Sequence, residues 1–503
     1  MPYALLLVLL LPTLGVPVVY LTGRKSAKAA AILVALIAIA NMALVLTTVP
    51  TVLNSPEHRY VESYYWIPIL NSQFTLFVDG ISLSIAIITL VLILAAALFS
   101  INYMQEKKNL AVYYALLTML SIGLVGVFIT SNLLLFYFCW ELMLVPAYFI
   151  IGGWGYRDSY RAAFKFFIFT HAGAVFVLLG IGAIFMVTHT TDMFQAQTAL
   201  MTVSPDLVKW ILVSLTAGFA VKMAVVPVHM WLPDAHSEAP APMSALLSGV
   251  IISAGAYAIL RLSLGTVFPA VSGTEFGSLF LHGLTIFGVV SAFFGSFIAL
   301  VETDIKRIIA YSSIAHMGYV MFGLSLFPSS PVSGGTVAIT AAITGTVLHI
   351  LNHAVSKGLF FLSAGAVMHQ TEVRDIREMG GLAGKMPFTA ATSATAALSI
   401  AGTPPFACFI SEFLIFVGAF QVINSDGFYL WPTAFMLIAT VLSLAYSLRY
   451  LSHVFLGQAK SEKKILDVPG FMKLAMAILA VLVVVLGIWP TFFINLITTV
   501  RFV

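Results

Sequence analysis

Long apolar runs separated by short polar loops recur from one end of the chain to the other. Each run has about 20 residues, the length of helix that crosses a hydrocarbon core of roughly 30 Å. About fourteen runs meet this length criterion, near residues 2–23, 28–49, 80–103, 110–130, 131–153, 162–188, 208–230, 241–266, 278–301, 307–327, 338–369, 388–422, 429–455 and 471–499. The alternating pattern of a membrane β-barrel is absent. The sequence therefore predicts an all-α polytopic membrane protein.

Two of these predicted helices, the seventh and the twelfth, contain prolines close to a charged residue. Pro227 follows Lys222, and Pro404 and Pro405 precede Glu412. Proline removes a helical hydrogen bond and bends or breaks the helix. Simple packing kinks would also explain these prolines, but broken helices at corresponding places in two halves are typical of transporters built from inverted repeats. We therefore expect three N-terminal helices (1–109), two inverted five-helix repeats (110–266 and 278–455) and a C-terminal helix (456–503).

Composition and loop charge support this interpretation and add an orientation. Hydrophobic residues make up 60% of the chain and charged residues 9%, which excludes a soluble globular protein. Arg59 and Lys209 are the clear basic residues in the loops after even-numbered helices, whereas the loops after helices 1, 3, 5, 9, 11 and 13 contain Arg24, Lys25, Lys28, Lys107, Lys108, Arg157, Arg161, Lys306, Arg307, Arg374, Arg377, Lys385, Lys460, Lys463 and Lys464. The positive-inside rule places the odd-numbered loops in the cytoplasm and both termini outside the plasma (inner) membrane. The net charge of +4 follows from this bias and indicates no nucleic-acid partner.

Ionisable residues deep inside the predicted helices are few: Glu141, Lys222, His316, His349, His353, Lys357 and Glu412. A carboxylate in the middle of a membrane helix costs roughly 3 kcal/mol, so it usually marks a pathway or a partner. His349, His353 and Lys357 follow one another at spacings that place them on one face of a single helix. We expect water between these side chains to pass protons along this stripe.

Alternative readings of the histidines remain open. Histidines at positions i and i+4 also suit a metal pair, but no carboxylate or third ligand lies near His349 and His353 in the sequence, so no metal site is predicted. His316 alone also fits a packing histidine. The two cysteines, Cys139 and Cys408, are far apart, and no Gly-rich phosphate loop or Cys-rich cluster motif occurs. We therefore expect no cofactor in this chain, and any electrons belong to another subunit.

Three further features are weaker candidates. His171, in the sixth helix, is placed to line an input path. The turn DAHSEAP contains Asp234, His236 and Glu238, which suit either proton entry or a turn held by capping and prolines. Asp79 begins the third helix and fits an acidic N-cap.

Several motifs resemble one family closely. FYFCWELMLVPAYFIIGGWG, AVKMAVVPVHMWLPDAHSEAPAPMSALLSG, IKRIIAYSSIAHMGYVMFG, NHAVSKGLFFLSAGAV and VRDIREMGGL are similar to the antiporter-like proton-translocating subunits of respiratory complex I and its relatives. Those relatives include membrane-bound hydrogenases, deazaflavin-dependent dehydrogenases and multisubunit Na⁺/H⁺ antiporters. The resemblance covers most of helices 3 to 13. WELMLVP and the glutamate of SEFLIF are most similar to the M-type subunit.

The resemblance implies roles for individual residues. It implies that Glu141 and Lys222 form an ion pair that opens and closes, that His316 connects the two halves, that Lys357 is a central lysine and that Glu412 is an exit-side acid. The chain also departs from the M-type pattern, because Ser253 stands where a lysine of the eighth helix is usual. A serine orders water but holds no transferable charge, which favours a route through His316 and the stripe. The histidine-to-lysine spacing of this stripe is more like the hydrogenase and antiporter branches.

Two functions follow as expectations. The first is a non-catalytic proton-pumping subunit of a redox-driven, complex I-like or hydrogenase-like quinone oxidoreductase, which depends on other membrane subunits and on a redox arm. The second is a subunit of a multisubunit Na⁺/H⁺ antiporter. A membrane scaffold without transport has difficulty explaining the buried charges.

Overall fold

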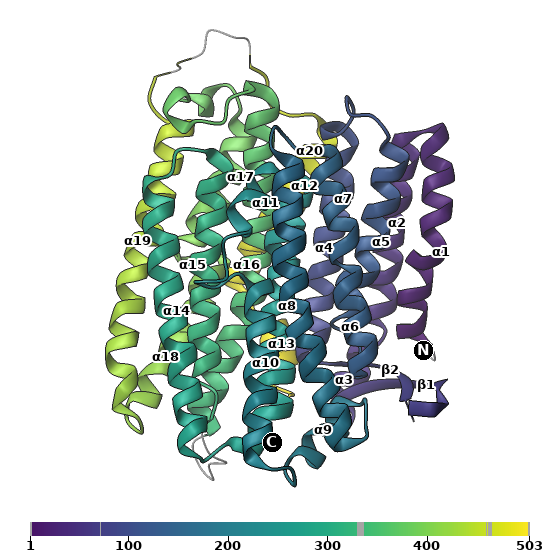
Figure 1. Ribbon diagram of the computed structural model, residues 1–503. Coiled ribbons are helices and arrows are strands. Elements are labelled where there is room, and N and C mark those ends of the chain that lie inside the picture. Colours follow the sequence, from purple (N-terminus) through teal and green to yellow (C-terminus); the bar gives the residue numbers. More distant parts are fainter. Residues whose placement is uncertain (1–2, 71, 329–335, 459, 461–464, 501–503) are drawn as a thin grey trace.

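The computed structural model describes residues 3–70, 72–328, 336–458, 460 and 465–500, so Lys463 and Lys464 lie outside the described residues. Figure 1 shows long helices that run side by side from one end of the bundle to the other, with both chain ends near its lower end. The described helices are α1 (Ala4–Lys25), α2 (Ala27–Leu46), α3 (Val49–Asn54), α4 (Gly80–Tyr103), α5 (Leu110–Gly126), α6 (Leu133–Leu142), α7 (Leu144–Trp154), α8 (Ser159–Thr188), α9 (Met193–Leu200), α10 (Pro205–Met223), α11 (Leu232–Glu238), α12 (Ala241–Leu246), α13 (Ile252–Ala258), α14 (Glu275–Val301), α15 (Ile305–Ser325), α16 (Thr336–Thr371), α17 (Pro387–Ile400), α18 (Ala407–Ile423), α19 (Leu430–Phe455), α20 (Gly470–Ile488) and α21 (Thr491–Ile497). Two π-helical segments, Leu247–Ile251 and Ile259–Val267, flank α13.

Eleven helices within the described ranges are long and apolar enough to cross a membrane, judged by length and composition. Two shorter apolar helices, α5 and α18, accompany them. The predicted twelfth helix is divided between α17 and α18, and the predicted seventh, α10, carries charge at both ends. The structure confirms a multi-pass helical membrane protein, while the count of about fourteen spans stays a prediction based on run length.

Both proline-containing helices leave helical structure where the sequence indicated. The seventh predicted helix ends with α10 at Met223, where Ala224 adopts a left-handed conformation (φ 59°), and the chain becomes helical again at Leu232. The twelfth ends with α17 at Ile400 and resumes at Ala407, with Gly402 at φ 65°. Each interruption leaves carbonyl groups without helical partners, so each is a place where polar groups gather inside the bundle.

A β-hairpin at the lower end of the bundle departs from the predicted all-α fold. The hairpin pairs β1 (Arg59–Ile67) with β2 (Ser72–Asp79) in antiparallel register. The segment RYVESYYWI is rich in the aromatic and β-branched residues that favour strands. Glu62 in β1 accepts hydrogen bonds of 3.0 Å from the backbone N–H groups of Leu5 and Leu6. The hairpin therefore caps the start of α1.

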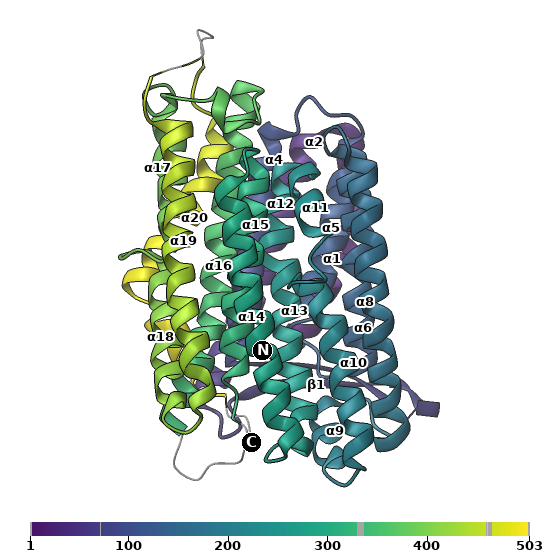
Figure 2. The same ribbon diagram turned by 60° about the vertical axis from the view of Figure 1, so that its left-hand side comes forward.

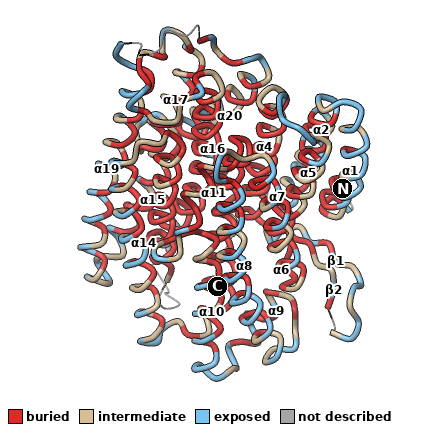
Figure 3. The backbone as a smooth tube through the Cα atoms, turned by 45° about the horizontal axis from the view of Figure 1, so that its top comes forward, coloured by how far each residue is buried: buried red, intermediate tan, exposed pale blue. Residues whose placement is uncertain are grey.

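Burial is greatest in the helices that contain the internal polar residues. Figure 3 shows most of α15 and α16 as buried, and the segment Ala241–Val271 is also enclosed. Figure 2 shows α14, α15 and α16 side by side, and α16 also packs against α18. By contrast, α8, α14 and α19 present many apolar side chains to the surface. The ionisable residues of α15 and α16 therefore lie in the interior, behind helices suited to face lipid.

Candidate functional site

Lys222 lies in the last turn of α10, directly before the interruption of that helix. A helix C-terminus carries a partial negative charge, which favours a cation at this position. The ammonium Nζ donates a hydrogen bond of 2.9 Å to the backbone carbonyl of Trp140 and lies 3.9 Å from the centre of the Trp140 ring. Lys222 is only 2% exposed. It is therefore a buried cation held by α6 through a carbonyl and a cation–π contact.

Glu141 is the next residue along α6, yet its side chain contacts a different helix. Its Oε2 lies 3.2 Å from Nδ1 of His171 in α8. Consecutive residues of an α-helix point about 100° apart, so Trp140 and Glu141 face different neighbours. No ion pair among the described residues joins Glu141 to Lys222. The direct pair that the resemblance implied is therefore absent in this structure, because the carboxylate turns to α8.

The pair of Glu141 and His171 lies at the side of the bundle. The Glu141 side chain is 25% exposed and that of His171 is 50% exposed. The His171 ring stacks on Phe167, with ring centres 5.6 Å apart, so the packing of α8 fixes its direction. The sequence predicted that His171 lines an input path for protons, and in the structure His171 contacts Glu141.

Three polar residues meet in the second half of the molecule: His316 of α15, His349 of α16 and Glu412 of α18. His316 Nδ1 lies 3.1 Å from His349 Nε2 and 4.0 Å from Glu412 Oε1. The outer nitrogen of His349 lies 2.9 Å from Ser411 Oγ, and that of His316 lies 3.4 Å from the Tyr446 hydroxyl. All three members of the cluster are buried. The sequence predicted that these residues belong to one proton path, and the structure shows which of them lie within contact distance.

Lys357 and His353 continue this cluster along α16. The Lys357 ammonium donates to the Ile309 carbonyl, at 3.2 Å, and to the Ser312 hydroxyl, both in α15. The His353 ring lies 5.7 Å from the His316 ring. Both ring nitrogens of His353 are buried and have no hydrogen-bond partner among the described residues. Buried polar atoms of this kind are places for ordered water.

Ser253 makes a local contact. Its hydroxyl donates to the carbonyl of Gly249 at 2.9 Å and is buried, so it is engaged within its own helical segment. One turn earlier, the hydroxyl groups of Ser248 and Ser313 lie 2.9 Å apart and connect this segment to α15. No feature of the sequence marks this contact, because serines in apolar helices are common and the two lie in separate predicted spans.

The DAHSEAP turn is held by ion pairs near the loops that carry most of the basic residues. Asp234 contacts Lys165 at 2.7 Å and Arg307 at 3.0 Å. Glu238 contacts Arg374 at 3.0 Å. Burial alone would lower the pKa of Arg374, but Asp304 and Glu238 raise it overall. These contacts favour the interpretation that the two carboxylates, Asp234 and Glu238, hold the turn in place.

His236 lies in the same turn but points inward. It is fully buried, its Nδ1 lies 2.9 Å from the Leu232 carbonyl, and its ring centre lies 5.5 Å from that of Phe361 in α16. His236 is therefore placed between the ion-paired turn and α16, as a route from that end toward the stripe would require.

Asp79 forms the N-cap that its position predicted. Its Oδ1 accepts from the backbone of Ile81 and Ser82, and the Ser82 hydroxyl completes a capping box. The carboxylate also forms a buried ion pair of 2.7 Å with Arg261. The sequence contained no signal for this partner, because 182 positions separate the two residues.

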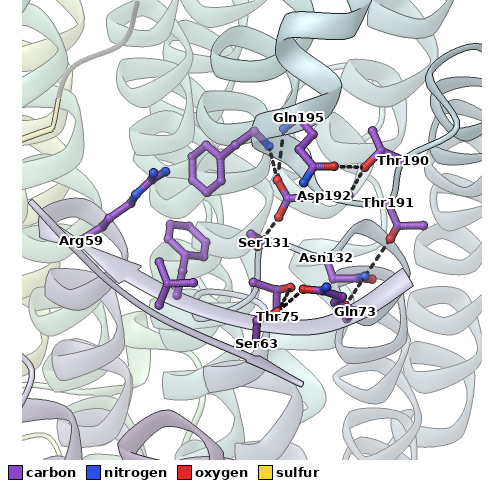
Figure 4. Close-up of a pocket in the computed structure, with 13 residues that line it drawn as sticks. Arg59, Ser63, Gln73, Thr75, Ser131, Asn132, Thr190, Thr191, Asp192 and Gln195 are labelled. Atoms are coloured by element: carbon purple, nitrogen blue, oxygen red, sulfur yellow. Dashed lines mark hydrogen bonds between the residues drawn. The ribbon is translucent and has the colours of Figure 1, made fainter. Parts of the chain in front are cut away.

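A polar pocket of about 420 Å³ lies against the hairpin. Figure 4 shows Asp192 within it, close to Ser131 and Gln195. The Asp192 carboxylate accepts a hydrogen bond of 2.8 Å from the Ser131 hydroxyl and caps α9 through the backbone N–H groups of Phe194 and Gln195. None of the buried ionisable candidates lines this pocket. Its carboxylate therefore serves the local structure.

Among the described residues, one cluster has the composition of a metal site. The ligand atoms of His316, His349 and Glu412 all lie within 4.8 Å of one another. The three residues belong to three different helices and do not include His353, so the spacing of His349 and His353 in the sequence did not reveal this cluster.

Comparisons with known proteins show the family and the fold of the chain. Residues 130–443 match a family described as NADH:quinone oxidoreductase/Mrp antiporter, TM. NADH-quinone oxidoreductase subunit M of Pseudomonas aeruginosa is 35% identical over 449 residues, which cover 86% of this chain and 82% of the relative. F(420)H(2) dehydrogenase subunit M of Methanosarcina mazei is 32% identical over 442 residues, covering 86% and 84%. A chain of respiratory complex I from Thermus thermophilus has the same fold, with a TM-score of 0.83, 22% identity and coverage of 98% and 97%.

Proposed function

Because the chain belongs to the NADH:quinone oxidoreductase/Mrp antiporter family of membrane proteins and resembles its M subunits, we propose that it is a proton-translocating subunit of a redox-driven complex. Its relatives are named as subunits of NADH-quinone oxidoreductase and of F(420)H(2) dehydrogenase. The chain works beside other antiporter-like membrane subunits, and a redox arm supplies the energy. The basic loops lie in the cytoplasm and both termini lie outside.

The observation that carries this proposal is the buried cluster of His316, His349 and Glu412. Three ionisable side chains from three helices lie close together away from lipid. Such groups are costly inside a membrane protein and are usually functional. Imidazole rings accept a proton on one nitrogen and release one from the other, so the two histidines pass protons between Lys357 and Glu412.

The first half of the path acts as a switch. Glu141 exchanges partners between His171, which it contacts here, and Lys222. When the carboxylate faces Lys222, it stabilises the protonated ammonium. When it turns to His171, as it does here, Lys222 loses that stabilisation and its proton becomes easier to pass on. Trp140 holds the Lys222 ammonium in place during the exchange. Ser248 and Ser313 order water on the way from Lys222 to α15.

Energy for the transport comes from neighbouring subunits. Moving one charge against 100 mV costs roughly 2.3 kcal/mol, and the sequence carries no nucleotide or cofactor motif. We therefore expect the parent complex to acidify vesicles during turnover, whereas the purified chain alone does not. Pumping by the isolated chain would contradict the dependence on partners.

The direct test is His316→Gln in the parent complex. Glutamine keeps hydrogen bonding but carries no transferable proton, so proton uptake per electron should fall while the complex still assembles and oxidises its donor. The control is His369→Gln, a histidine near the end of α16 whose ring lies beside Tyr103. Full pumping by the His316→Gln complex would overturn the proposed path.

Exchange of Na⁺ for H⁺ is the second candidate, because the matched family also includes Mrp antiporters. An imposed Na⁺ gradient would then drive proton movement in vesicles without an electron donor. Proton movement that needs the donor and ignores Na⁺ supports the first function.

A further inference from the structure

We propose that His316, His349 and Glu412 bind a divalent cation of the zinc class, in competition with the transferable proton. Two imidazole nitrogens and a carboxylate oxygen form a ligand set that zinc prefers. The three ligand atoms lie within 4.8 Å of one another and belong to α15, α16 and α18. The cation would therefore join three helices at the point where the proton path crosses between them.

The distances suit such a site. Zinc binds imidazole nitrogen at about 2.0–2.1 Å, so two ligand atoms of a tetrahedral site lie roughly 3.3 Å apart. His316 Nδ1 and His349 Nε2 are 3.1 Å apart, while Glu412 Oε1 is 4.0 Å from His316 Nδ1. A shift of the Glu412 carboxylate toward the two histidine nitrogens would complete three ligands, and water takes the fourth position.

Both histidines have oxygen partners at their outer ring nitrogens, as histidines that bind a metal ion usually do. Ligating histidines usually direct their other ring nitrogen to an oxygen partner, which fixes the tautomer. His349 Nδ1 lies 2.9 Å from Ser411 Oγ, and His316 Nε2 lies 3.4 Å from the Tyr446 hydroxyl. If both outer nitrogens carry hydrogen, two lone pairs face each other at 3.1 Å. A proton or a metal ion between them relieves that repulsion.

The class of cation follows from the donor atoms. Imidazole nitrogen favours Zn²⁺, Cu²⁺ or Ni²⁺, whereas Mg²⁺ and Ca²⁺ require mostly oxygen ligands. The consequence for transport rests on the proposed function. A bound cation occupies the lone pairs that carry protons, so it blocks the step from His349 to Glu412.

The test uses the full chain in lipid nanodiscs, purified through a tag without histidine, and Co²⁺ as the spectroscopic probe. Tetrahedral Co²⁺ gives a strong visible absorption that octahedral Co²⁺ does not. We expect one tetrahedral site in the wild-type chain, displaced by Zn²⁺. His349→Gln should weaken Co²⁺ binding by about tenfold or more, because even outer-shell changes cost about that much.

His353→Gln is the matched control. His353 lies one turn further along the same helix and is equally buried, but it is not one of the three ligands. Its substitution should leave Co²⁺ binding within about twofold of the wild type. Loss of a ligand, or of a hydrogen-bond partner of a ligand, would weaken the binding by about tenfold or more. Glu412→Gln is a second ligand variant, which keeps the test valid if His349→Gln fails to fold. Tetrahedral absorption that survives in both ligand variants, or is lost equally in His353→Gln, would overturn the site.

The metal site and the proton path fail in distinguishable ways. Co²⁺ binding is measured without electron transfer, so its absence beside intact pumping overturns the metal site alone. Zn²⁺ should also inhibit proton uptake by the parent complex, and the His369→Gln complex, changed outside both the proton path and the three ligands, should retain the wild-type affinity for that inhibition. Binding in nanodiscs without any inhibition of uptake would overturn the competition between metal and proton.

Discussion

Glu141 and Glu412 are both carboxylates in apolar helices, yet the structure surrounds them in opposite ways. The Glu141 side chain is 25% exposed at the side of the bundle and contacts a half-exposed histidine, whereas that of Glu412 is 8% exposed and lies among buried groups from three helices. A charge facing lipid is costly. We therefore expect a neighbouring subunit to cover Glu141 in the complex, while Glu412 is enclosed by this chain itself.

The contrast extends to the cations of the two halves. Lys222 lies in the last turn of an interrupted helix and donates to the Trp140 carbonyl of α6, while Glu141 contacts His171. Lys357 lies inside a continuous helix and is held by α15. The first half is thus built around a carboxylate with two available partners, and the second around fixed neighbours. This difference is expected of a switch joined to a relay.

The largest expected effect is that of Glu412→Gln. Glutamine has nearly the same shape, so the complex should assemble, but the last ionisable group of the relay is lost. A positioned proton-transfer group contributes at least about a hundredfold to rate, so proton uptake should fall by about tenfold or more even if water partly replaces it. Uptake into vesicles during donor oxidation measures this. Uptake near the wild-type rate would show that the buried carboxylate is structural.

The next effect tests whether the first half is a switch. Glu141→Gln and Lys222→Ala should each strongly reduce coupled proton uptake, because each removes one charge of the exchange. The double variant should lose little more than either single one, with a coupling energy of about 1–3 kcal/mol, since residues that act together give non-additive losses. The measurement is uptake by the three variant complexes side by side. Simple additivity would mean that Glu141 and Lys222 act independently.

Gly402→Ala should have a smaller effect on proton uptake, because it changes the surroundings of Glu412 and leaves the carboxylate itself in place. An added Cβ at residue 402 would overlap the Glu412 carboxylate, and Gly402 has φ +65°. Gly457 has a similar φ of +77° but open space around its Cβ position. Gly402→Ala and Gly457→Ala should both lower the free energy of unfolding by about 1 kcal/mol. Only Gly402→Ala should also slow proton uptake, as measured beside thermal unfolding of both variant complexes. Equal uptake in the two complexes would contradict the tight contact.

His171→Gln should have the smallest effect. A hydrogen bond contributes about 0.5–1.5 kcal/mol, so losing the contact with His171 biases Glu141 toward Lys222 without removing either of those two groups. Proton uptake should change by about fivefold, which corresponds to 1 kcal/mol. The same vesicle assay at several pH values measures the change. A loss as large as that of Glu141→Gln would instead make His171 an obligatory carrier.

The sequence by itself determined the membrane character, the two interrupted helices and the ionisable residues inside the helices. These features are local: a span is set by about 20 apolar residues, and proline acts on its own helix. The shared face of His349, His353 and Lys357 was also accessible, because it depends only on helical periodicity. Even the family could be recognised from continuous motifs.

Only the tertiary structure decided which polar groups meet. It turned Glu141 to His171, placed Glu412 beside His316 and His349, and paired Asp79 with Arg261. Partners from different helices depend on helix rotation and packing, which no short segment encodes. The β-hairpin was missed for a related reason, since its strands are stabilised by pairing with each other and by contact with the start of α1. The residue types alone therefore list the buried charges, whereas the distances between residues on different helices show which of them form a site.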